Sequence, residues 1–126
     1  MKQISGWNIP KRTYRSAIVL LKNNLYNPCL QNIQQCVEKA LKAILIEKMS
    51  MLKKTHSIAE LKNKLEENNV TVSLSDEDCD FLDSIYLPSK YPLGGVLPDF
   101  YPDEEICKDG IKIAESVLNS VQKMLI

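Results

Sequence analysis

A long amphipathic helix is predicted by residues 28–49, which read PCLQNIQQCVEKALKAILIEKM. Apolar residues recur there at steps of three and four, so they share one face of a helix. This stripe consists of Leu30, Ile33, Val37, Ala40, Leu41, Ile44 and Leu45, while Glu38, Lys39, Lys42 and Lys48 lie largely off it. Because Ala, Leu, Lys, Glu and Gln are good helix formers, the composition of the segment agrees with its periodicity.

A first helix is expected before this segment, over residues 11–25. Its apolar residues also recur at helical spacing and end at Leu25. Between the two helices, Asn27 has the side chain of an N-cap, and Pro28 suits the first position of a helix. We therefore expect the long helix to begin at Pro28 with Asn27 as its cap.

Three more helices are expected after residue 50. Ser57 and Glu60 have the spacing of a capping box and predict a short helix that ends near residue 67. Ser75 is the expected N-cap of a fourth helix with an acidic first turn, and Pro102 is the expected start of a fifth. Together the segments predict an all-α fold, a four- to five-helix antiparallel up-and-down bundle.

The chain has the size and composition of one globular domain, residues 1–126. Of its 126 residues, 44% are hydrophobic and 25% are charged, and no internal repeat or linker is visible. The start has no apolar core of a secretory signal, and the longest apolar runs are too short to span a bilayer. We therefore expect a cytoplasmic protein without membrane contact.

The cysteines indicate free thiols rather than a metal centre. The four cysteines contain no C-x-x-C pair, and only one histidine is present to complete a zinc site. A reduced, buried or half-buried thiol behaves as a small hydrophobic side chain. We expect no metal and no cofactor.

Charge is distributed unevenly, although the formal net charge is +0. Residues 1–37 hold five bases and no acid, whereas residues 75–110 hold ten acids and two bases. The basic first helix could pair with acidic helices of the same fold. Alternatively, the asymmetry makes a bipolar surface suited to self-association or to a charged partner.

Residues 87–101 read as a long loop, because they contain three prolines and a pair of glycines. The loop is long for a connection in a compact domain, and tyrosines lie in or beside it. Long loops that carry aromatic side chains are common places for function.

No complete catalytic motif is present. The sequence lacks G-x-S-x-G, a Walker P-loop and G-x-G-x-x-G, and its acidic cluster at residues 76–83 lacks the spacing of a calcium loop. His56 is the only histidine, and it could simply pack against or cap the helix that follows it. Lysines of the long helix could contact phosphate if the fold brings them together, although a solvated helix face is the commoner outcome.

Three segments in this order resemble the HEPN family. Residues 34–46, QQCVEKALKAILI, look like the second helix of that family. The segment that begins Thr55-His56-Ser57-Ile58 resembles the next motif, and Ile85-Tyr86 followed by Tyr91-Pro92 resembles a stretch before the last helix. The resemblance covers about residues 7–124.

The resemblance implies a helical bundle that forms a homodimer and works beside a small nucleotidyltransferase, as in toxin–antitoxin-like systems. Some members are RNases with an R-x(4–6)-H motif. No arginine stands four to six residues before His56, and Lys90 replaces the arginine common before the tyrosine–proline pair. No catalytic residue is therefore assigned.

The leading hypothesis is a non-catalytic module that binds a nucleotide or RNA. Its candidate phosphate-binding residues are Lys39, Lys42, His56, Lys90 and Tyr91. The alternatives are an RNase with a degenerate site at His56 and a purely structural helical adaptor.

Overall fold

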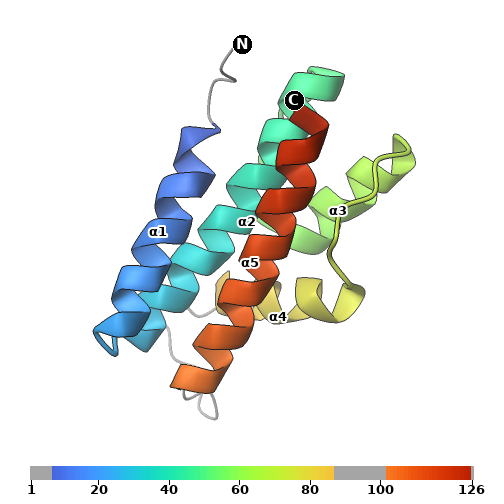
Figure 1. Ribbon diagram of the computed structural model, residues 1–126. Coiled ribbons are helices and arrows are strands. Elements are labelled where there is room, and N and C mark those ends of the chain that lie inside the picture. Colours follow the sequence, from blue (N-terminus) through green and yellow to red (C-terminus); the bar gives the residue numbers. More distant parts are fainter. Residues whose placement is uncertain (1–6, 87–101, 126) are drawn as a thin grey trace.

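The computed structural model describes residues 7–86 and 102–125, which form five α-helices (Figure 1). They are α1 (Asn8–Lys22), α2 (Tyr26–Met49), α3 (Ile58–Glu67), α4 (Asp76–Tyr86) and α5 (Glu104–Leu125). No strand occurs within these two ranges. The all-α helical bundle is confirmed.

Helix α2 is the centre of the bundle and contacts each of the other four helices. Figure 1 shows α1 running antiparallel to α2 and to α5, with these three long helices side by side. The shorter helices α3 and α4 pack on each other and on α2, on the side of α2 away from α1. The linker between α2 and α3 consists of residues 50–57 and therefore runs along the side of α2.

The core is built around the apolar stripe of α2, as its periodicity predicts. All seven residues of the predicted stripe are fully buried. They pack with buried side chains of α3, α4 and α5, among them Leu61, Leu82, Val117 and Val121. Burial of this apolar surface is the main force that holds the helices together.

Helix α5 approaches α2 closely at Gly110. A Cβ atom at this position would lie 2.8 Å from Cδ1 of Ile33 and 3.4 Å from its Cγ2. Any larger residue would therefore have to displace the buried side chain of Ile33. The absence of a side chain at Gly110 lets the two long helices pack at this distance.

The junction of α1 and α2 differs from the expectation. Helix α1 ends at Lys22, because Asn24 adopts a left-handed backbone with φ 59°, which asparagine tolerates better than most residues. Helix α2 then begins at Tyr26 with Leu25 as its N-cap, so the assignment of Asn27 as the cap is wrong. Pro28 lies within the first turn instead, where a missing N–H costs no helical hydrogen bond.

The later helix starts follow their capping residues. Ser75 accepts a hydrogen bond from the amide of Asp78, whose carboxylate accepts one from the amide of Ser75. Asp103 accepts from the amide of Ile106, so α5 starts at Glu104 and not at Pro102. Both caps satisfy amides that lack partners within the helix.

All four cysteines are buried free thiols, as their spacing suggested. Burial raises the pKa of Cys36 and of Cys107 to about 12, and that of Cys79 to about 11. Very little reactive thiolate therefore forms at neutral pH. Within the described ranges, no helix combines the length and the apolar character needed to cross a membrane.

Candidate functional site

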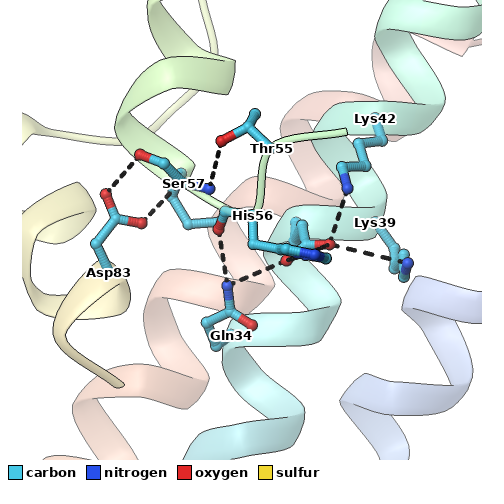
Figure 2. Close-up of polar contacts among 9 residues, drawn as sticks. Gln34, Lys39, Lys42, Thr55, His56, Ser57 and Asp83 are labelled. Carbon is cyan, nitrogen blue, oxygen red and sulfur yellow. Dashed lines mark hydrogen bonds and ion pairs between the residues drawn. The ribbon is translucent and has the colours of Figure 1, made fainter. Parts of the chain in front are cut away.

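The candidate site is centred on a buried carboxylate, Glu38 of α2. Its side chain is only 4% exposed, although the residue lies off the apolar stripe of the helix. The linker between α2 and α3 crosses the helix here and brings His56 against it (Figure 2). A buried carboxylate needs partners, because removal of a charge from water is costly.

Two lysines of the same helix supply positive charge to Glu38. Lys42, one turn further along, places its Nζ 3.0 Å from Oε2 of Glu38, and its side chain is 14% exposed. Lys39 is looser, with Nζ 3.8 Å from the same oxygen and a side chain that is 43% exposed. Lys42 is therefore the inner partner, and Lys39 is the more accessible one.

His56 completes the charged cluster from the linker. Its Nδ1 lies 3.1 Å and 3.2 Å from the two carboxylate oxygens of Glu38, while 45% of its side chain is exposed. A hydrogen on Nδ1 donates to the carboxylate, and in the neutral ring this tautomer leaves Nε2 without a hydrogen. The contact thus selects both the orientation and the tautomer of the imidazole.

Two opposing effects act on the pKa of Glu38, namely its burial and the hydrogen bonds and charges of its partners. Burial alone would raise the pKa, but hydrogen bonds from Lys42, His56 and Gln34, together with the charge of Lys42, lower it below its usual value of 4.5. Glu38 is therefore ionised at neutral pH. We call Glu38, Lys39, Lys42 and His56 the Glu38 cluster.

Gln34 ties the cluster to the linker backbone. The buried Gln34 lies one turn before Glu38, and its Nε2 donates to Oε1 of Glu38 at 3.3 Å. The same nitrogen donates to the carbonyl of His56, also at 3.3 Å. One amide group thus holds both the carboxylate and the main chain of the histidine.

The start of α3 is held by a carboxylate from α4. Asp83 accepts hydrogen bonds from the amide of Ile58 at 2.6 Å, the amide of Ala59 at 3.3 Å and the hydroxyl of Ser57 at 3.0 Å. Ser57 in turn accepts from the amide of Glu60 at 3.2 Å. The first three amides of α3 are therefore satisfied by Asp83 and Ser57, and a negative charge at this helix end is favourable.

The capping box at Ser57 is only half formed. Ser57 accepts from the amide of Glu60 as expected, but the amide of Ser57 donates to Oγ1 of Thr55 at 3.1 Å. His56 does not cap this helix, because Ser57 and Asp83 do so. Figure 2 shows His56 turned instead toward α2 and Gln34.

Three of the five candidate residues converge in the structure. Lys39, Lys42 and His56 meet at Glu38, while Lys90 and Tyr91 lie outside the described residues. The sequence reasoning missed Gln34, Glu38 and Asp83. The i, i+4 spacing of Gln34, Glu38 and Lys42 was a readable signal on a helix, whereas nothing local connects Asp83 to Ser57.

The Glu38 cluster has the chemistry of an anion site. One carboxylate can neutralise only one of the two ammonium groups, so positive charge remains at an open surface. Among the described residues, no three His, Cys, Asp or Glu side chains are grouped so that they could hold a metal ion. Ammonium and imidazole groups around an excess of positive charge suit a phosphate oxygen.

Comparisons with known proteins agree with the fold. The HEPN domain family model matches residues 7–124. The chain is similar to the structure of TT1696 from Thermus thermophilus, with 22% identity, a TM-score of 0.77 and 94% of each chain covered. It is also similar to ST0689, an archaeal HEPN homologue, with 26% identity, a TM-score of 0.72 and 100% of each chain covered. No curated protein sequence matches.

Proposed function

The chain belongs to the HEPN family, and on that premise we propose that it is a non-catalytic module that binds a phosphate group of a nucleotide or RNA. The observation that carries this proposal is the convergence of Lys39, Lys42 and His56 on the single carboxylate of Glu38. Lys39 and His56 are the exposed members and would contact the ligand. Lys42 and Glu38 would hold them in place.

The exposure of the cluster favours a ligand that lies along the surface. Lys39 and His56 are nearly half exposed, so the phosphate would remain partly hydrated. Contacts of this kind are electrostatic and depend little on base sequence. We therefore expect binding that weakens as salt rises.

The test is binding of a fluorescent single-stranded RNA and of inorganic phosphate to wild type and to two matched lysine variants. Lys39→Gln removes the accessible lysine of the cluster, whereas Lys48→Gln removes an exposed lysine from the last turn of the same helix. We expect Lys39→Gln to weaken RNA binding and to reduce the slope of log K against log salt by about 1. Lys48→Gln should behave as wild type.

Two results would contradict the proposal. Equal weakening by both variants would indicate general attraction to a basic helix rather than a site. No binding, with no rise in Tm in millimolar phosphate or nucleotide, would indicate a purely structural helical adaptor, because a ligand of the native state must raise its apparent stability.

The same proposal extends to partners. We infer a homodimer that works with a small nucleotidyltransferase in a toxin–antitoxin-like system, as the family resemblance implies. Affinity purification of the tagged chain from its native host, followed by mass spectrometry and light scattering, tests this. Co-elution of a nucleotidyltransferase in a fixed stoichiometry would support the partner role, and a homodimer alone would remove it.

One observation favours a second candidate, an RNase with a degenerate site. A histidine oriented through Nδ1 by a carboxylate is an arrangement that general base catalysis uses. Lys39 or Lys42 would then have to stabilise the transition state in place of an arginine. If RNA cleavage is detected and a His56→Ala variant retains all of it, this candidate is wrong.

A further inference from the structure

Asp83 is a carboxylate outside the Glu38 cluster whose partners all lie at the start of α3. It comes from α4, 27 residues after His56 in the chain. Its two oxygens accept three hydrogen bonds, from the amides of Ile58 and Ala59 and from the hydroxyl of Ser57. These partners begin at the residue that follows His56.

His56 itself lies in a segment without regular secondary structure. Residues 50–57 belong to no helix, so no intrahelical hydrogen bond fixes the main chain at His56. The carbonyl of His56 accepts a hydrogen bond from Gln34 of α2, and the hydroxyl of the next residue, Ser57, donates to Asp83 of α4. Figure 2 shows Asp83 beside Ser57 and Gln34 beside the main chain of His56.

We propose that Asp83 is the positioning residue for the Glu38 cluster. It holds the start of α3 in the place where His56 meets the carboxylate of Glu38. The expected effect of Asp83 on ligand binding rests on the proposed function. Its effect on the geometry of His56 does not, because that geometry can be measured without a ligand. Asp83 thereby joins α4 to a site that consists of residues from α2 and the linker.

An asparagine at position 83 would break this arrangement with little change of shape. The amide has one acceptor oxygen instead of two and places an NH₂ group where the second oxygen stood. It cannot accept from both the amide of Ile58 and the amide of Ala59 through separate oxygens, as Asp83 does. It also lacks the negative charge that favours a helix N-terminus.

The experiment is ¹⁵N NMR of the imidazole in Asp83→Asn, with Ser75→Ala as the matched control. His56 is the only histidine in the chain, so its ring nitrogens are assigned without ambiguity. Ser75→Ala removes the N-cap of α4, so it also costs a hydrogen bond at the start of a helix. Ser75 is exposed, and its hydrogen bonds are made with Asp78 in the first turn of α4. In wild type and in the control we expect nitrogen shifts of a ring protonated at Nδ1.

In Asp83→Asn we expect the two nitrogen shifts to move toward those of a free imidazole, because the ring leaves Glu38. Binding of inorganic phosphate should weaken roughly threefold to tenfold, which corresponds to the loss of about one hydrogen bond. Unchanged nitrogen shifts in a folded Asp83→Asn protein would overturn the proposal, and so would equal shifts in the control.

The two proposals can fail separately. If wild type does not bind phosphate, the proposed function fails, but the nitrogen shifts still decide the role of Asp83. If Asp83→Asn does not fold, Ser57→Ala replaces it. This variant removes one Asp83 contact and the cap on the amide of Glu60, and it leaves both amide contacts of Asp83 in place. A smaller movement of the same nitrogen shifts is then expected, and its absence counts against the proposal.

Discussion

Glu38 is the residue on which the candidate site depends, because it is charged and buried at once. Its partners are two lysines, the histidine and Gln34, so the carboxylate does not lack hydrogen bonds. Loss of such a carboxylate leaves Lys42 without its counter-charge and Gln34 without one acceptor. A hydrogen bond to a charged group contributes more to stability than a neutral one.

We predict that Glu38→Gln lowers the free energy of unfolding by about 2 kcal/mol at neutral pH. Because the folded-state pKa of Glu38 is lowered, the contribution of its charge is fully present above the unfolded value near 4.5 and is lost as pH falls through the folded value. The difference between wild type and variant should therefore shrink below about pH 4.5.

Urea denaturation at a series of pH values measures this difference. Glu47→Gln, at an exposed glutamate of the same helix, is the control and should cost less than about 0.5 kcal/mol at every pH. A cost for Glu38→Gln that stays constant through the acid range would show that its charge is not what stabilises the fold.

At the scale of the helices, the packing of α5 against α2 depends on Gly110. A glycine inside a helix is normally less favourable than alanine by about 1 kcal/mol. Here an added Cβ would lie 2.8 Å from Cδ1 of Ile33, which is fully buried and has little room to move. Overpacking of this kind typically costs more than the helix propensity that alanine adds.

We predict that Gly110→Ala destabilises the wild type by about 1 kcal/mol, but not the Ile33→Val variant. Valine lacks Cδ1, so in that background the clash is relieved and the better helix propensity of alanine should remain. A double-mutant cycle of unfolding free energies measures the coupling. Additive effects of the two substitutions would contradict the close contact.

At the scale of the whole molecule, the feature to explain is the uneven distribution of charge between the basic first helix and the acidic α4 and α5. Helix α1 carries four bases and no acid, whereas α4 and the first two turns of α5 carry half of the 16 acids of the chain. In the part of the chain that the structure describes, no ion pair joins α1 to another helix, and the acid Glu115 of α5 accepts a hydrogen bond from Tyr14 instead. Among the described residues, ion pairs with other helices therefore do not neutralise the positive charge of α1.

We predict that the proposed homodimer is held in part by these opposite charges. Light scattering should show a dimer fraction that falls as salt rises, because exposed charges are screened beyond a Debye length of about 10 Å at 0.1 M salt. Arg12→Glu with Arg15→Glu should lower the dimer fraction at low salt, and Lys64→Glu should not. A dimer that resists both salt and charge reversal would instead be held by apolar contacts.

The helices and the core could be predicted from local patterns, because periodicity and capping act over a few residues. The stripe of α2, the caps at Ser57 and Ser75, and the burial of the cysteines were all foreseen in this way. The junction at residues 23–26 was not, since the left-handed turn at Asn24 interrupts an apolar pattern that continues through it.

The candidate site could be predicted only in part, because it depends on distance in space. Gln34, Glu38 and Lys42 share one helix, so their mutual contacts follow from helical spacing. The approach of His56 to Glu38 and the contact of Asp83 with Ser57 require the path of the linker and the packing of α4 against α3. Such contacts join residues 18 and 26 positions apart, and they follow from packing of the whole core rather than from any local pattern.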